Sequence, residues 1–63
     1  MIGFQSKFDI GSRKPYIVTT YILKYVMGRL FSKGMLERKE FYYHEEKEQY
    51  IKTLLDKGYT KIK

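Results

Sequence analysis

The sequence predicts an α+β fold: a small antiparallel sheet of three to four strands packed on one C-terminal amphipathic helix. Three observations lead to this class. Residues 2–10 alternate between apolar and polar side chains, residues 16–27 are rich in β-branched residues and tyrosine, and residues 45–57 carry an apolar stripe at helical spacing. The predicted order is β-β-β-α, with a short final strand left as an alternative.

The chain has 63 residues, enough for one domain over 1–63 and near the lower limit for folding without disulfides or a metal. It has no cysteine and one histidine, His44, so it lacks the residues of a disulfide framework, a zinc site or a catalytic triad. We therefore expect no catalytic residues, no metal and no cofactor. No apolar run reaches the roughly 20 residues that span a bilayer, and the first residues lack a signal-peptide pattern. We expect a cytoplasmic protein with no membrane partner.

The first strand is predicted from period-two alternation. Ile2, Phe4, Phe8 and Ile10 fall on one face, which is the pattern of a half-buried strand. The segment 11–15 that follows contains glycine, serine and a proline that cannot donate to a ladder, so the strand should end there.

Residues 16–27 fit two patterns. As a helix, they form an apolar stripe at i, i+1, i+4, i+5 spacing, with Pro15 at the first helical position. As a strand, they place Ile17, Tyr21, Leu23 and Tyr25 on one face. Most of the segment is β-branched or tyrosine, which favours a strand because such side chains crowd a helix.

A turn is predicted at Ser32–Gly34 and a third strand over residues 36–43. The middle of this strand, residues 37–40, is fully charged, as expected for an edge or a solvated hairpin arm.

The C-terminal helix is predicted from one apolar stripe: Tyr50, Ile51, Leu54 and Leu55. Three glutamates between residues 45 and 48 complement the positive end of the helix dipole, which explains them better than acid–base chemistry does. Gly58 supplies a left-handed C-cap, and Tyr59 can pack back onto the last turn. Residues 59–63 are either a short strand or a tail.

The net charge of +6 is unevenly spread. Residues 1–33 carry six bases against one acid, and residues 34–63 carry seven bases against six acids. This asymmetry favours an anionic partner for the N-terminal part, DNA or RNA above all.

Basic residues alternate with aromatic and hydroxyl residues in and beside the second strand: Arg13, Lys14, Tyr16, Thr20, Lys24 and Arg29. The even-numbered face of this strand is the less apolar one, so we expect it to be exposed. Such a face contacts phosphates by charge and bases by stacking or hydrogen bonds. The leading hypothesis is a small, basic, non-enzymatic nucleic-acid-binding protein.

The rival hypothesis uses the same face. Tyr16, Val18, Ile22 and Val26 would form an exposed apolar patch, because one helix covers only one face of a sheet. Such a patch is typical of a surface that contacts another protein. The protein would then form a homodimer, or it would act as an inhibitor or adaptor that targets a host enzyme.

The pattern from Tyr16 to Leu55 resembles the three-stranded-sheet-plus-helix DNA-binding modules, which include the arm-binding domains of phage integrases and the AP2-like domains. The likeness rests on Tyr16–Tyr21, Gly28–Leu30, Lys39–Phe41 and the helix. It implies that the sheet enters the DNA major groove with the helix behind it. In size, basicity and lysine- and tyrosine-rich composition the chain also resembles small early bacteriophage proteins, which implies a phage or mobile-element origin and a role in host takeover.

Overall fold

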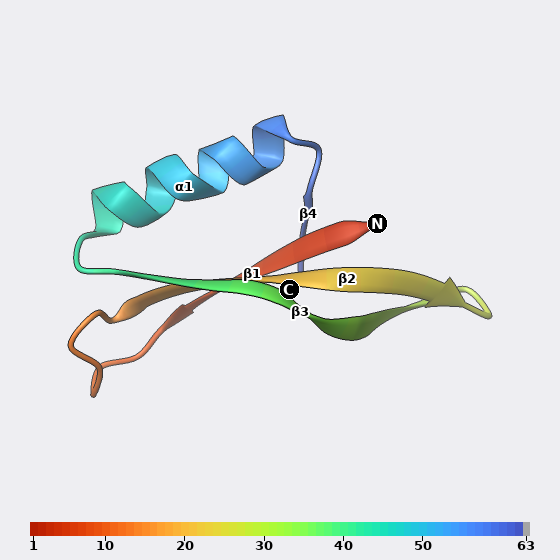
Figure 1. The fold of residues 1–63 in the computed structure, drawn as a ribbon, viewed down its shortest axis with the longest axis horizontal. Helices are drawn as coiled ribbons and strands as arrows, with labels where there is room; N and C mark the ends of the chain where they lie inside the picture. The colour runs from red at the N-terminus through yellow and green to blue at the C-terminus, as the bar shows by residue number, and fades with distance from the viewer. Residues whose placement is uncertain (63) are drawn as a thin grey trace.

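The computed structural model describes residues 1–62. Its elements are β1 (Ile2–Phe8), β2 (Tyr16–Val26), β3 (Arg29–Phe41), α1 (His44–Asp56) and β4 (Thr60–Lys61) (Figure 1). The strands form one sheet in the order β3-β2-β1-β4, which confirms the predicted α+β class. The three long strands are antiparallel as predicted, whereas β4 runs parallel to β1, so the complete sheet is mixed.

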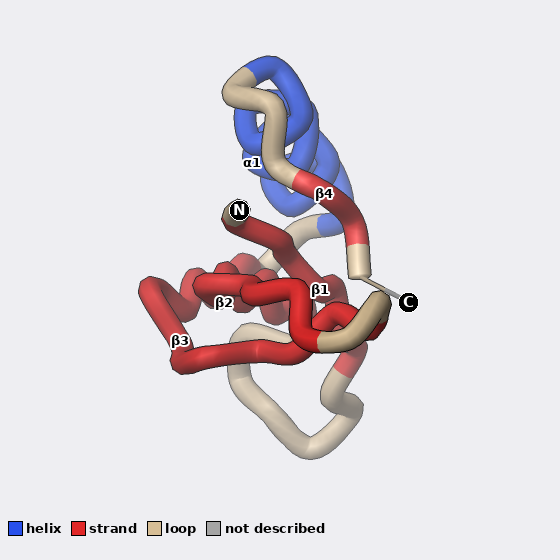
Figure 2. Tube along the Cα trace, turned by 90° about the vertical axis from the view of Figure 1, so that its right-hand side faces the viewer, coloured by secondary structure: helices blue, strands red, loops and turns tan. Residues whose placement is uncertain are grey.

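The helix lies over one face of the sheet and leaves the other face without a second layer (Figures 1 and 2). The loop between β1 and β2 extends to the side away from the helix, as Figure 2 shows. The far end of the β2–β3 hairpin projects beyond both α1 and β4 (Figure 1). The sheet therefore presents two surfaces that the helix does not cover: its open face and the hairpin arm.

The core forms between the helix and the even-numbered residues of β1 and β2. Antiparallel pairing places Phe4 beside Thr20 and Ser6 beside Val18, so even positions on both strands share a face. Phe4, Val18 and Leu54 are buried there. Four partly buried side chains pack around them: Phe41, Tyr50, Ile51 and Tyr59.

Both ends of the helix are stabilised by residues that the sequence singles out. At the start, the Tyr43 backbone N–H donates to the Glu46 carboxylate at 3.2 Å. At the end, Gly58 has a φ of +85°, and its N–H donates to the Leu55 carbonyl at 2.9 Å. The Tyr59 N–H donates to the Leu54 carbonyl at 3.1 Å, which completes a Schellman motif and confirms the predicted C-cap.

The ambiguous second segment is a strand, as favoured, but the turn predicted after it is wrong. The chain reverses at Met27 and Gly28, whose φ angles are +52° and +79°. Both central residues of a type I′ hairpin turn require positive φ, and its twist matches the strands. The predicted turn at Ser32–Gly34 therefore lies inside β3, which also begins well before residue 36. The register with β2 shifts twice along β3, so Lys33 and Leu36 have no partner residue on β2.

Met27 occupies a backbone conformation that favours asparagine over methionine. Its side chain is 98% exposed and loses nothing by becoming polar. We expect Met27→Asn to raise the free energy of unfolding by about 1 kcal/mol, measured by chemical denaturation, because asparagine adopts the left-handed conformation more readily than methionine. Met35→Asn, also exposed but inside β3, is the control and should give no gain. An equal gain in both variants would show that replacing an exposed apolar side chain by a polar one, and not the geometry of the turn, is responsible.

Candidate functional site

The even-numbered face of β2, predicted to be exposed, is covered by the helix over its first half. Val18 is 1% exposed and Thr20 is 4% exposed. The Thr20 hydroxyl donates to the Glu37 backbone carbonyl at 3.3 Å, which satisfies it inside the sheet. Val18 therefore belongs to the core and not to a protein interface, and Thr20 has no surface to offer a nucleic acid.

Tyr16, also predicted to bind a partner, packs beneath the start of the helix. Its ring lies 5.2 Å from the Phe8 ring and 5.8 Å from the His44 ring, centroid to centroid. The Lys47 ammonium lies 5.5 Å from its centroid. These contacts give Tyr16 a structural role in joining α1 to the sheet.

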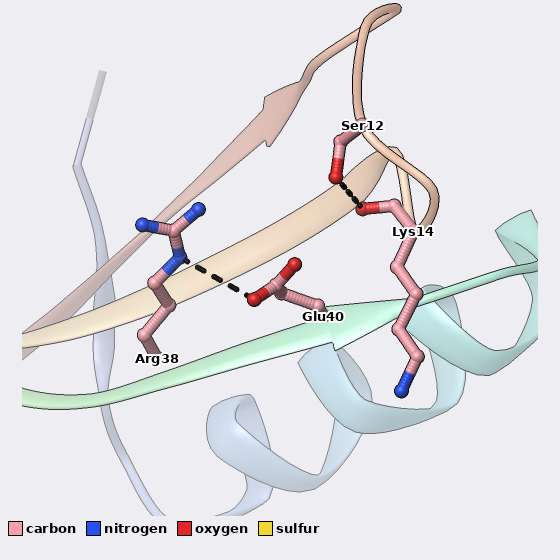
Figure 3. Close-up of polar contacts among 4 residues, drawn as sticks. All are labelled: Ser12, Lys14, Arg38 and Glu40. Carbon is pink, nitrogen blue, oxygen red and sulfur yellow. Dashed lines mark hydrogen bonds and ion pairs between the residues drawn. The ribbon is translucent and has the colours of Figure 1, made fainter.

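The four predicted cations do not lie together. Arg13 is exposed in the β1–β2 loop, while Lys24 and Arg29 are exposed on the hairpin arm. Lys14 is half-buried, with its ammonium 5.0 Å from the centre of the Tyr42 ring. In Figure 3 its side chain runs past β3 toward the helix side.

Two residues of the predicted protein interface remain exposed because they lie beyond the helix. Ile22 and Val26 are each about two-fifths exposed. They belong to the hairpin arm, defined here as residues 21–36. Other large apolar side chains are exposed on the same arm: Tyr25, Met27, Leu30, Phe31, Met35 and Leu36.

The open face is built from the odd-numbered residues of β1 and β2. Residues that pair directly across strands point to the same side of a sheet. One row across the three strands is Gln5, Thr19 and Arg38. The next row toward the β1–β2 loop is Lys7, Ile17 and Glu40. Figure 3 shows Arg38 and Glu40 on the side of β3 that faces away from the helix.

This face contains a hollow of about 280 Å³. It is lined by eight residues from β1, β2, β3 and the loop: Gln5, Lys7, Asp9, Ile17, Thr19, Tyr21, Met35 and Arg38. Ile17 is only 5% exposed although no layer covers this face. The hollow therefore has an apolar part, an aromatic ring, two cations, one carboxylate and neutral hydrogen-bonding groups.

Ion pairs on β3 differ between its two faces. The Lys39 ammonium lies 3.1 Å from a Glu37 carboxylate oxygen on the helix side. On the open face, Arg38 Nε lies 4.0 Å from Glu40 Oε1. In Figure 3 the dashed contact runs from Nε and not from either terminal nitrogen of Arg38. The four N–H donors on the terminal nitrogens of Arg38 therefore take no part in this contact.

Charge is segregated between the helix and the rest of the chain. Residues 44–56 hold four acids against two lysines, whereas the remainder of the sequence holds eleven bases against three acids. The hairpin arm holds Lys24, Arg29 and Lys33 and no acid. None of these three forms an ion pair within residues 1–62.

The Tyr50 hydroxyl, on the helix side of the sheet, has a clearly shifted pKa. Burial raises the pKa of the Tyr50 hydroxyl, and the negative charge of Glu37 acts in the same direction. A neutral hydroxyl at the edge of the core is structural, so this shift does not mark a reactive site.

Five residues of the open face are absent from the site that the sequence predicts: Gln5, Lys7, Thr19, Tyr21 and Arg38. A signal exists in β1, where Gln5 and Lys7 alternate with Phe4 and Phe8. The pairing register decides which residues of β2 and β3 share a face with Gln5 and Lys7, and no sequence pattern determines that register. Arg38 lies within the charged run, which indicates an exposed strand but not which face of the sheet each charge occupies.

Comparison with known proteins shows no matching family model, curated protein or solved structure. Among residues 1–62, no helix is long and apolar enough to cross a membrane. Within the same range, no cluster of three or more histidine, aspartate or glutamate side chains is placed to hold a metal ion.

Proposed function

We propose that this protein binds nucleic acid through the surface that the helix leaves uncovered, namely the open face of the sheet together with the hairpin arm. The observation that carries the proposal is the segregation of charge. The cations of the arm have neither an acid in their own segment nor an ion-pair partner within residues 1–62, while the acids concentrate on the helix. A phosphate backbone is the partner that such a surface attracts most strongly.

The geometry supports the same assignment. The hairpin arm is a two-stranded ribbon that projects past the helix (Figure 1), and a ribbon of this kind fits within a groove or along a strand. Lys7 and Arg38 extend the positive surface onto the open face, where Thr19 lies beside Arg38 and Tyr21 begins the arm. Cations provide affinity and position, and the neutral side chains provide contacts to bases.

Binding to fluorescent DNA and RNA oligomers, followed by anisotropy, tests this function. We expect dissociation constants in the micromolar range or below at about 50 mM salt, weakening at least tenfold by about 200 mM because bound phosphates release counterions. Absence of binding at the lower salt would contradict the proposal. Binding that does not change with salt would also contradict it, because phosphate contacts would then contribute little.

A protein partner is the second candidate function, and one observation favours it. The hairpin arm exposes apolar side chains on both of its faces, with Tyr25 and Leu30 paired on one and Lys24 and Phe31 paired on the other. Exposed apolar surface of this kind marks protein contacts. An inhibitor or adaptor that inserts this arm into a host protein, or a homodimer formed through it, would bind with little salt dependence. The salt titration therefore separates the two functions.

A further inference from the structure

We infer that the hollow on the open face binds one unpaired nucleotide, so that the protein selects single-stranded over double-stranded nucleic acid. This inference rests on the proposed function and names its substrate class. It starts from the shape of the site. A base inside a duplex offers only its edge in a groove, whereas a base that enters a hollow must leave its stack and its pair.

The hollow has the size for this ligand. Its volume of about 280 Å³ is slightly below the range of roughly 300–1,000 Å³ that holds drug-sized molecules. A single nucleobase with part of its sugar is smaller than such molecules and fits this volume. The site is also open to solvent, so the rest of a strand can continue across the sheet.

The lining offers a partner for each part of a nucleotide. The Tyr21 ring and the apolar Ile17 side chain provide surfaces for the face of a base. Gln5 and Thr19 are paired across β1 and β2 and provide donors and acceptors for its edge. Arg38, on β3, provides the positive charge for its phosphate.

Asp9 lies in the hollow and limits which part of the ligand can approach the loop side. One of its carboxylate oxygens accepts the Gly11 N–H at 3.2 Å. The backbone around it is held by hydrogen bonds from Asp9 N to the Pro15 carbonyl at 2.8 Å and from Ser12 N to the Asp9 carbonyl at 3.1 Å. The Ser12 hydroxyl also donates to the Lys14 carbonyl at 3.2 Å (Figure 3). A fixed carboxylate repels phosphate and accepts hydrogen bonds from an exocyclic amino group, as found on cytosine, adenine and guanine.

The phosphate and the base therefore have separate places. The phosphate lies toward Arg38, whose terminal nitrogens take no part in the contact with Glu40 (Figure 3), and the base edge lies toward Asp9 and Gln5. This arrangement predicts a preference for bases that carry an amino group over thymine and uracil, whose N3–H donor is flanked by two ring carbonyls that the Asp9 carboxylate would repel.

The test compares four probes at one salt concentration: oligo(dC), oligo(dT), a mixed-sequence duplex of equal length, and cytidine monophosphate. We expect oligo(dC) to bind about tenfold or more tightly than the duplex and measurably more tightly than oligo(dT). Cytidine monophosphate should bind far more weakly than the oligomer, because it lacks the contacts that neighbouring phosphates make with the arm.

Two adjacent residues of β3 provide matched variants. Arg38 and Lys39 have side-chain exposures of 51% and 49% but lie on opposite faces of the sheet. Arg38→Gln should weaken oligo(dC) binding about tenfold and reduce the preference over the duplex. Lys39→Gln removes the same charge and should leave that preference unchanged. Circular dichroism of both variants establishes that they are folded.

The outcomes separate this inference from the proposed function. If the duplex binds as tightly as oligo(dC) or more tightly, or if the two β3 variants have equal effects, then the hollow does not bind one unpaired nucleotide. The proposal that the protein binds nucleic acid would stand in either case. No binding of any oligomer at low salt overturns both. If cytidine monophosphate binds as tightly as oligo(dC), the hollow still binds a nucleotide. The ligand would then be a free nucleotide, and the inference that it belongs to a single strand would be overturned.

Discussion

Val18→Asp is expected to unfold the protein. Val18 is 1% exposed and packs with Phe4 and Leu54 at the centre of the core. A carboxylate there has no partner, and burying an unpaired charge costs about 4 kcal/mol or more. A domain of 63 residues has a total stability of roughly 3–9 kcal/mol. The variant should lose its cooperative thermal transition and most of its far-ultraviolet circular dichroism at room temperature.

Ile22→Asp is the matched control, because Ile22 lies on the same strand and the same even-numbered face. Its side chain is 41% exposed and lies beyond the helix, so the new carboxylate can remain hydrated. We expect a loss of less than about 1.5 kcal/mol and a folded protein. If Val18→Asp is as stable as Ile22→Asp, then the helix does not cover the first half of β2 and the assignment of the open face is wrong.

These two positions also show why the face predicted from the sequence is wrong. The even residues of β2 are the more polar set, and polarity alone therefore predicts that they are exposed. In the structure, the face is decided by the pairing with β1, whose even residues include Phe4 and Phe8. Phe8 pairs with Tyr16 across a loop of seven residues, and a shift of one residue in this register would reverse every side chain of β2. Sequence periodicity alone does not determine that register.

The elements whose signal is local were predicted correctly. The apolar stripe, the early glutamates and Gly58 locate the helix to within a residue at each end, because each of these acts within one or two turns. The alternation from Ile2 to Ile10 is equally local, but its last part was predicted wrongly: β1 ends at Phe8, and Ile10 is 86% exposed in the loop that follows. The prediction of the hairpin turn failed because Met27 is an unusual residue at positive φ, and because Ser32-Lys33-Gly34 is typical of a turn although the bulged strand β3 accommodates it.

A triple variant of the hairpin arm, Lys24→Gln, Arg29→Gln and Lys33→Gln, is expected to lose most nucleic-acid affinity. The three cations are exposed and free of ion pairs within the described residues, so their removal leaves the fold unchanged. For each phosphate that the variant no longer binds, the slope of log affinity against log salt should decrease by about one. We expect this slope to fall by about two to three and the affinity at low salt to fall at least about tenfold, both measured by anisotropy.

The control removes the same charge from the other side of the molecule. Lys52 lies on α1, Lys57 directly follows it, and Lys61 pairs with Phe4 in β4 on the helix side of the sheet; all three are exposed. Their replacement by glutamine also lowers the net charge by three. If nucleic acid binds at the hairpin arm, this variant should retain most of the affinity and most of the slope of log affinity against log salt. If both triple variants weaken binding equally, then only the overall charge attracts the nucleic acid, and the hairpin arm makes no specific contact. Because net charge is matched, a difference between the two variants can arise only from where the cations lie.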